Sequence, residues 1–223
     1  MHFGSFNINI GDINAILVTH EHIDHVKSIA TLSNKYNIPV YATCKTWNSM
    51  PLIHSKLSKD NIKNFTIDNE FKINSLKILP FSVPHDAAEP CGFNVFDGSK
   101  KISIATDLGH MNNSVFTYLK NSEFIFLESN YDQEVLKYSS YPYTLKQRIL
   151  SDSGHMSNRY AGNLLSKCVG EKTKHVILAH ISEHNNCKEL VLEEVKEELK
   201  DINFNESKLI LTEQNTASEM IEV

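Results

Sequence analysis

The sequence predicts a mixed α/β fold, and three observations carry that prediction. Strand-like apolar runs alternate with helical segments along the chain, which is the pattern of an α/β protein. The 223 residues, 41% of them hydrophobic, are enough for one sizeable core and too few to suggest two. Several of the apolar runs end in histidine or aspartate, at the position where sheets of this class present their chemistry. We therefore expect residues 1–223 to form a single domain.

The first half of the chain predicts short strands around one helix. Residues 15–19 and 39–42 are short apolar runs, typical of buried strands. Between them, residues 25–36 repeat apolar side chains with helical spacing, at Val26, Ile29, Ala30 and Leu32. Further strands are expected at residues 65–67 and 76–83.

The second half begins with a predicted hairpin. Residues 92–96 and 101–106 are its two strands, because Asp97-Gly98 between them favours a tight turn. The remaining apolar runs predict strands over residues 123–128, 175–179 and 209–211, and the helical patterns predict helices over residues 157–169 and 190–199.

Composition excludes several classes of protein. No apolar run approaches the roughly 20 residues that a membrane-spanning helix needs. The first residues lack the basic and then apolar layout of a secretory signal. The four cysteines are scattered, without the paired spacing of a zinc or redox motif, and we expect them to be reduced thiols. These observations predict a cytoplasmic protein with no membrane association.

The charge is distributed unevenly. The net charge of −5 does not indicate nucleic-acid binding by the whole surface. Residues 137–174, however, hold seven basic and two acidic side chains, including Arg148 and Arg159, the only arginines of the chain. This segment is either an ordinary solvated surface or a phosphate-binding one, since the planar guanidinium suits phosphate.

One short segment holds an unusually dense group of histidine and aspartate side chains. Within six residues, directly after the first predicted strand, stand His20, His22, Asp24 and His25. Imidazole and carboxylate are ligands for zinc, manganese or iron. Such a density of histidines has little structural use, because every ring nitrogen needs a partner. The segment therefore predicts a metal site.

Three further ligand-type residues have the same placement. His85, Asp107 and His180 each follow an apolar strand. Singly, each would more often be a hydrogen-bonded loop residue than a ligand. Four strand ends that all finish in a ligand type are hard to assign to chance.

In this order the seven residues resemble the dinuclear metallo-β-lactamase superfamily, which implies an αββα sandwich. The resemblance implies that His20, His22 and His85 bind one divalent metal and that Asp24, His25 and His180 bind a second, with Asp107 bridging them. A glutamate replaces the second histidine of the run in the flavodiiron branch. Here that position is His22, which favours the hydrolytic branch.

Residues 142–158 (PYTLKQRILSDSGHMSN) and 178–186 (LAHISEHNN) narrow the resemblance to the bacterial WalJ/YycJ/VicX group. That group implies a phosphodiesterase, a 5′-to-3′ exonuclease that acts on DNA through a metal-bridging hydroxide. Its members carry several dozen residues more before the metal-binding run, including a strand ending in Asp-x-Gly. Only nineteen residues precede His20, so we expect the first N-terminal strands of the family to be missing.

Catalytic roles are expected for two residues beyond metal binding. Asp24 could relay the proton of the attacking water. His155 precedes the predicted helix at residues 157–169, whose start favours anions, so with Arg148 and Arg159 it could receive the substrate phosphate. The alternative for His155 is a capping-region histidine with purely structural hydrogen bonds.

Two other functions stay open from the sequence. One is a thioester or lactone hydrolase that uses the same metals, which would need an apolar acyl pocket. The other is a catalytically silent remnant that binds metal without turnover. The sequence does not settle the native metal among zinc, manganese and iron, or the oligomeric state.

Overall fold

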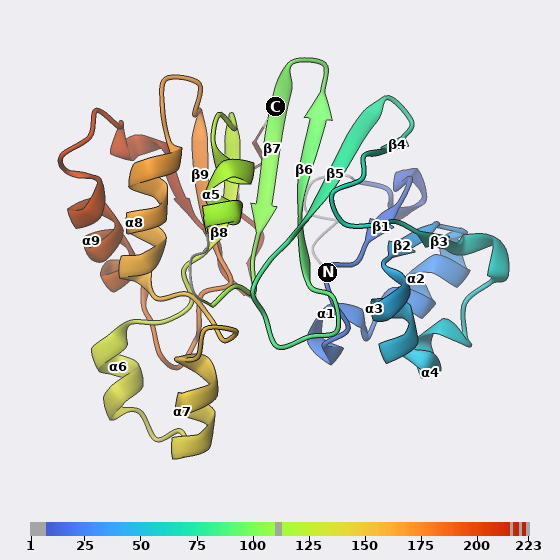
Figure 1. Ribbon diagram of the computed structural model, residues 1–223, viewed down its shortest axis with the longest axis horizontal. Coiled ribbons are helices and arrows are strands. Elements are labelled where there is room, and N and C mark those ends of the chain that lie inside the picture. Colours follow the sequence, from blue (N-terminus) through green and yellow to red (C-terminus); the bar gives the residue numbers. More distant parts are fainter. Residues whose placement is uncertain (1–7, 110–112, 215, 219, 222–223) are drawn as a thin grey trace.

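The computed structural model describes residues 8–109, 113–214, 216–218 and 220–221, and its centre is a pair of β-sheets (Figure 1). One sheet has seven strands in the order β10-β9-β8-β7-β6-β5-β4, and the other has three in the order β1-β2-β3. The strands are β1 (Ile16–Leu17), β2 (Val40–Ala42), β3 (Ile62–Asn64), β4 (Phe71–Ile73), β5 (Leu76–Ser82), β6 (Cys91–Asp97), β7 (Lys100–Ala105), β8 (Phe124–Glu128), β9 (His175–Ala179) and β10 (Leu209–Leu211).

Helices cover the outer faces of both sheets, so the layers are helix, sheet, sheet, helix. The α-helices are α1 (Ile23–Val26), α2 (Ile29–Tyr36), α3 (Cys44–Ser49), α4 (Pro51–His54), α5 (Asn113–Leu119), α6 (Gln133–Tyr138), α7 (Tyr143–Ile149), α8 (Asn158–Cys168) and α9 (Lys188–Leu199). Short 3-10 turns span Ile10–Asp12, Lys59–Asn61 and Glu206–Lys208. This arrangement confirms the predicted αββα sandwich.

The layers follow from the alternation of side chains along the strands. Successive residues of a strand point to opposite faces of its sheet. In β2, Val40 and Ala42 pack with Trp47 against the N-terminal helices, whereas Tyr41 between them packs toward Phe71 and the larger sheet. Two apolar faces on one short strand therefore require a layer on each side.

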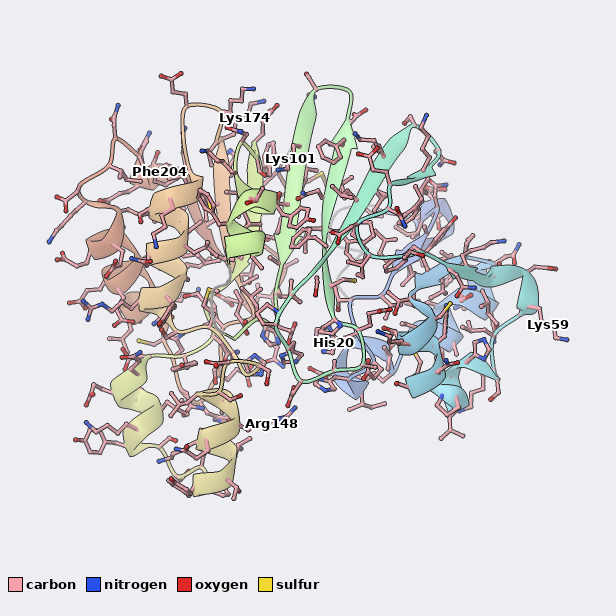
Figure 2. All side chains as sticks on the ribbon, in the orientation of Figure 1. His20, Lys59, Lys101, Arg148, Lys174 and Phe204 are labelled. Carbon is pink, nitrogen blue, oxygen red and sulfur yellow. The ribbon has the colours of Figure 1, made fainter. Side chains whose placement is uncertain are left out.

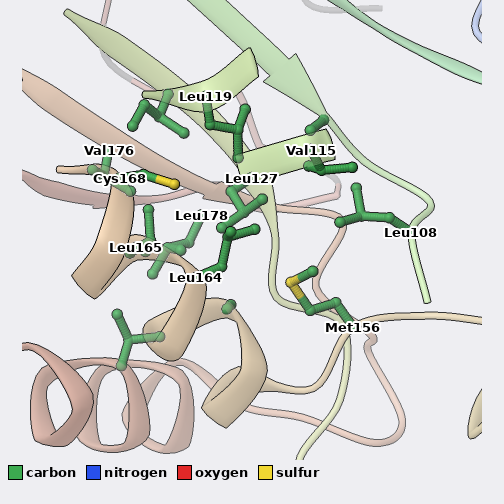
Figure 3. Close-up of a cluster of buried hydrophobic side chains, with 14 of the residues drawn as sticks. Leu108, Val115, Leu119, Leu127, Met156, Leu164, Leu165, Cys168, Val176 and Leu178 are labelled. Carbon is green, nitrogen blue, oxygen red and sulfur yellow. The ribbon is translucent and has the colours of Figure 1, made fainter. Parts of the chain in front are cut away.

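The largest part of the core lies between the seven-stranded sheet and helices α5, α8 and α9. Figure 3 shows Leu127 and Leu178 from the sheet against Leu164 and Leu165 of α8, all of them buried. Each such side chain contributes roughly 1.5–3 kcal/mol through its removal from water. This packing holds the sheet that carries half of the candidate site.

Strand direction brings the predicted site residues to one edge. Strands β7, β8, β9 and β10 are parallel to one another. Strand β5 runs in the same direction, because it pairs antiparallel with β6 and β6 pairs antiparallel with β7. The backbone N–H of Cys91, at the start of β6, donates to the carbonyl of Thr19 over 3.1 Å and ties the end of β1 to the same edge.

Some predicted elements differ from the observed ones. The helix expected at residues 25–36 is divided into α1 and α2, because residues 27 and 28 form a turn. The strand expected at residues 65–67 lies earlier, as β3, and Phe65 instead fills the core between the sheets. The hairpin of β6 and β7 is confirmed, and Gly98 turns it with a φ of +59°. Residues 1–5, used to assess a secretory signal, lie outside the described part.

None of the helices in the described ranges is both long enough and apolar enough to cross a bilayer.

Candidate metal centre and its surroundings

The residues predicted from strand ends converge beneath the common edge of the two sheets. Ligand-type atoms lie within 4.8 Å of one another in four overlapping groups. The groups are His20, His22 and His85; His20, His25 and Asp107; Asp24, His25 and His180; and Asp107, Glu128, His155 and His180. All seven predicted metal ligands therefore lie in one continuous cluster. In Figure 2, His20 and Arg148 both lie at this lower edge of the sheets.

One half of the cluster is built from three imidazoles. The ring centroids of His20, His22 and His85 lie 4.6–5.1 Å apart. The Nδ1 nitrogen of His85 is 3.0 Å from the carbonyl oxygen of Gly154, which fixes the N–H there and leaves Nε2 as the lone-pair nitrogen. Burial, followed by the neighbouring histidines, lowers the pKa of His20 to about 2, so that ring is held neutral, the form that binds metals.

The other half combines carboxylates and imidazoles. The Nε2 nitrogen of His25 lies 3.5 Å from a carboxylate oxygen of both Asp24 and Asp107. The Nε2 nitrogen of His180 lies 3.5 Å from the other oxygen of Asp107. Asp107 thus stands between the two halves, and its Oδ1 atom is also 3.9 Å from His85 Nε2.

A buried glutamate orients two of the histidines. Glu128, at the end of β8, is fully buried, and its Oε1 atom lies 2.7 Å from Nδ1 of His155 and 2.8 Å from Nδ1 of His180. Burial alone would raise the pKa of Glu128, but the two imidazole hydrogen bonds outweigh it and lower the pKa to about 2. Burial likewise opposes charge on His180, yet Glu128 and the nearby aspartates raise its pKa to about 9.

Two buried polar atoms test whether cations fit this cluster. Within the described residues, neither Nε2 of His20 nor Oδ2 of Asp107 has a hydrogen-bond partner. A buried carboxylate oxygen or imidazole nitrogen left unpaired costs free energy, and such atoms are normally satisfied. Both atoms belong to the candidate ligand groups. Divalent cations would satisfy them, so the residues fit a metal centre.

Backbone strain coincides with two of the ligand-type residues. Asp107 and His180 both have φ values of +56°, in the left-handed region. Non-glycine residues with positive φ are uncommon, and strained backbone of this kind clusters at functional sites. The free-energy cost of this backbone conformation is accepted at the two positions directly after β7 and β9, where it turns the side chains of Asp107 and His180 into the cluster.

The two arginines lie in different places. Arg148 makes a two-point ion pair with Asp86, with Nε–Oδ2 and Nη2–Oδ1 distances of 2.5 and 3.2 Å. Asp86 Oδ1 is in turn 3.4 Å from Nε2 of His85, so Arg148 lies at the edge of the cluster. Arg159 instead pairs with Glu198 on α9 and lines a separate pocket. The structure therefore brings His155 and Arg148 to the cluster, but not Arg159.

An open cavity of about 730 Å³ gives access to the cluster. Asp24, His25, His155 and His180 form part of its wall. The opposite wall comes from the α6–α7 segment and from the loop after β9, through Tyr141, Leu145, Arg148, Ile149, Ser182 and His184. The cavity therefore reaches the half of the cluster that holds Asp24, His25 and His180, whereas His20, His85 and Asp107 are buried behind it.

Comparison with known proteins identifies the family. A model of the β-lactamase superfamily domain matches residues 7–181. Exodeoxyribonuclease YycJ of Bacillus anthracis is 37% identical over 202 residues, which cover 91% of this chain and 76% of that protein. Exodeoxyribonuclease WalJ of Streptococcus pneumoniae is 35% identical over 181 residues, or 80% of this chain and 67% of the relative. The chain belongs to the YycJ/WalJ group of the metallo-β-lactamase superfamily.

Solved structures agree with the superfamily at the level of the fold. The metallo-β-lactamase fold protein YhfI from Bacillus subtilis superimposes with a TM-score of 0.70 at 17% identity, covering 94% of this chain and 78% of YhfI. Zinc-bound PqqB from Methylobacterium extorquens superimposes with a TM-score of 0.66 at 14% identity, covering 93% and 73% of the two chains.

Sequence reasoning missed two residues of this superfamily site. Glu128 was an available candidate, because it is the last residue of an apolar strand. Asp86 stands directly after His85, and its contact with Arg148 spans 62 positions of sequence, so no local pattern could reveal it. Glu21, within the histidine run, is in none of the ligand groups; its Oε1 atom accepts the N–H of Ala88 over 2.7 Å, which joins the run to the loop after His85.

Proposed function

We propose that this protein is a metal-dependent exodeoxyribonuclease that hydrolyses phosphodiester bonds in the cavity beneath the sheet edge. The observation that carries the proposal is that seven ligand-type side chains, His155 and Arg148 converge beside one open cavity. The identity to two exodeoxyribonucleases supports DNA as the substrate. We assign one metal to His20, His22 and His85, and a second to Asp24, His25 and His180, with Asp107 shared between them.

The bound cations would supply an activated water and offset the charge of the phosphate. Nitrogen and oxygen ligands of this kind suit zinc, manganese and iron alike. The side chain of Asp24 is two-thirds exposed and reaches the cavity, where it can accept the proton of the attacking water. The free thiols of all four cysteines support a cytoplasmic location as part of this proposal.

His155 and Arg148 are the residues we propose for the substrate phosphate. Glu128 holds the Nδ1–H of His155, so the remaining ring nitrogen is available to a phosphate or leaving oxygen at the cavity. The guanidinium of Arg148 now holds the carboxylate of Asp86, and a phosphate presents the same pair of oxygens. We propose that the substrate phosphate replaces Asp86 on Arg148.

The test compares DNA labelled at either end. Purified protein with added manganese is incubated with linear DNA that carries a 5′ or a 3′ label. We expect the 5′ label to be released first in short products, while the 3′-labelled strand shortens gradually. His85→Ala should remove this activity, whereas His54→Ala, which changes an exposed histidine on α4, should retain it.

Three outcomes would contradict the proposal. Equal degradation by wild type and His85→Ala would assign the activity to a contaminant. Intact DNA together with hydrolysis of a generic thioester would favour an acyl hydrolase. Intact substrates of both kinds would leave a metal-binding protein without turnover.

A further inference from the structure

The α6–α7 hairpin forms one wall of the catalytic cavity. In Figure 1 its two helices project beyond the strand ends, on the side where the candidate site lies. Tyr141 in the connecting loop lines the same cavity as His155, together with Leu145 and Arg148 of α7. The ring of Tyr141 is 6.2 Å from that of His184, on the neighbouring loop after β9. A strand of DNA that leaves the site along this wall therefore meets the loop of the hairpin.

Two tyrosines at the ends of this loop are strongly exposed. Tyr138 is the last residue of α6 and Tyr143 the first of α7, and they are 76% and 75% exposed. The other six tyrosines of the chain are all buried or half-buried. Exposed apolar side chains scattered singly need no explanation. A pair that flanks one loop is a different case here, because the same loop contributes Tyr141 to the wall of the cavity.

The loop between these tyrosines is held in place. The ammonium group of Lys146 donates to the backbone carbonyls of Lys137 and Ser139, each over 2.7 Å. Below it, a small apolar cluster of Tyr131, Leu136, Ile149, Tyr141 and Leu145 anchors both helices. The exposed rings therefore stand on a fixed support, which lowers the entropy that a ligand must overcome on binding.

The helices of the hairpin carry more basic than acidic side chains, and two of the cations are paired in the free protein, Lys137 with Glu134 and Arg148 with Asp86. Lys137, Lys146 and Arg148 lie on the hairpin against one acidic side chain of its helices, Glu134. The ammonium group of Lys137 lies 5.0 Å from the centre of the Tyr138 ring. Aromatic rings beside cations are the combination that binds single-stranded nucleic acid, since the rings stack on bases and the cations attract phosphates.

We propose that the loop of the α6–α7 hairpin is a stacking platform, with Tyr138 and Tyr143 receiving unpaired bases of the DNA strand whose phosphodiester enters the cavity. This inference rests on the proposed function. It adds a second contact between protein and substrate, in which the unpaired bases bind outside the metal centre. Stacking tolerates every base, because each has an aromatic face. The platform therefore gives affinity for an unpaired strand without sequence preference.

The test measures DNA binding apart from cleavage. The probe is a fluorescein-labelled phosphorothioate oligothymidylate that resists hydrolysis, with anisotropy recorded on the metal-loaded protein. Tyr138→Ser combined with Tyr143→Ser should weaken binding at least about tenfold, because stacking contributes roughly 1–3 kcal/mol per base. The corresponding double change to Phe keeps both rings and should bind as wild type. Leu52→Ser, which changes a 76% exposed side chain on α4, is the matched control and should have no effect.

A second readout separates the platform from the metal centre. Bis(4-nitrophenyl) phosphate is small enough to reach the cavity without contacting the loop, so its hydrolysis should be the same in wild type and in the double serine variant. Unchanged oligothymidylate binding by that variant, in a protein that degrades DNA, overturns the platform alone and would point to a protein partner for these rings. Wild type that hydrolyses the small phosphodiester but neither binds nor degrades DNA overturns the proposed function as well.

Discussion

Glu128 shows how much of this site depends on a single residue that contacts no solvent. Its Oε1 atom faces the Nδ1 nitrogens of His155 and His180, while its Oε2 atom accepts the backbone N–H groups of Leu108 and Met156 over 2.8 and 3.4 Å. All four partners approach as donors when both imidazoles are protonated at Nδ1. Only an ionised carboxylate accepts on both oxygens at once. Glu128 therefore sets the orientation of both rings.

Glu128→Gln should weaken metal binding by about 10- to 100-fold, the usual cost of losing a partner that orients a ligand. The amide has the size of the carboxylate but offers one accepting atom, so either the imidazoles or the backbone N–H groups lose their partner. Titration against a metal-binding dye measures the affinity, and circular dichroism checks the fold. Glu123→Gln, which loses an ion pair with Lys174 at the opposite end of β8, is the matched control and should bind metal normally. Equal affinity in both variants would contradict the orienting role.

At the scale of residues, the sequence predicted the site correctly where a ligand-type residue directly follows a strand. His85, Asp107 and His180 could be predicted to meet, because parallel strands end at a common edge of the sheet. Arg159 illustrates the limit of such reasoning. Its neighbourhood in sequence is basic, yet the direction of α8 carries its side chain to Glu198 and away from the cavity. Net charge along a segment does not reveal which face of a helix points to the site.

At the scale of elements, the turn between α7 and α8 connects the hairpin to the metal centre. A side chain at Gly154 would place its Cβ 2.2 Å from the carbonyl oxygen of Ile149 and 2.3 Å from that of Arg148. The carbonyl of Gly154 accepts the Nδ1–H of His85, and the next residue is His155. The close approach of these backbones therefore fixes two site residues at once, and glycine is required for packing and not for its φ.

Gly154→Ala should both destabilise the protein and weaken metal binding. The neighbouring atoms are backbone carbonyls, which cannot rotate away, so overpacking of about 1–3 kcal/mol is expected. For a chain of this size each kcal/mol lowers the melting temperature by roughly 2–4 °C. Gly170→Ala is the comparison, since nothing lies within 4 Å of its added Cβ. Thermal unfolding and dye titration of the two variants, measured side by side, test the prediction; similar results for both would refute it.

Several elements differ from the prediction, and for two of these cases the physical reason can be named. Helices α6 and α7 are short, with six and seven residues, and bury one narrow apolar stripe against each other. So short a stretch gives too few repeats to establish a helical period. Residues 65–67 carry the alternation of a strand, but Phe65 is drawn into the core between the sheets and the pairing stops at Asn64. Tertiary packing decided both cases, whereas the longer α8 and α9 were evident from their periodicity.

At the scale of the whole molecule, a net charge of −5 has to be reconciled with the strongly anionic DNA that we propose as the substrate. Long-range attraction cannot come from the total charge, so affinity for DNA has to come from the local groups near the cavity. Arg148 is placed there, and Asp86 balances its charge through an ion pair. Under the proposed function, the substrate phosphate would take the place of Asp86. Burial would raise the pKa of Asp86, but the hydrogen bond from Arg148 and the nearby charges keep it below its usual range. In the free protein, the positive charge of Arg148 is therefore neutralised by the ion pair with Asp86.

The two arginines allow this distribution of charge to be tested with a natural control. Each phosphate contact on a single strand contributes about 0.7 to the slope of log affinity against log salt concentration. Arg148→Gln should therefore reduce that slope by about 0.7 and weaken binding of the phosphorothioate oligothymidylate, whereas Arg159→Gln should change neither. Because Arg148→Gln also leaves Asp86 unpaired beside the DNA, a double variant with Asp86→Asn removes that repulsion. The double variant should recover part of the affinity but none of the slope, since the lost phosphate contact is not restored. A slope that falls equally in Arg148→Gln and Arg159→Gln would mean that DNA lies across both faces, and that the cavity edge has no special share in binding.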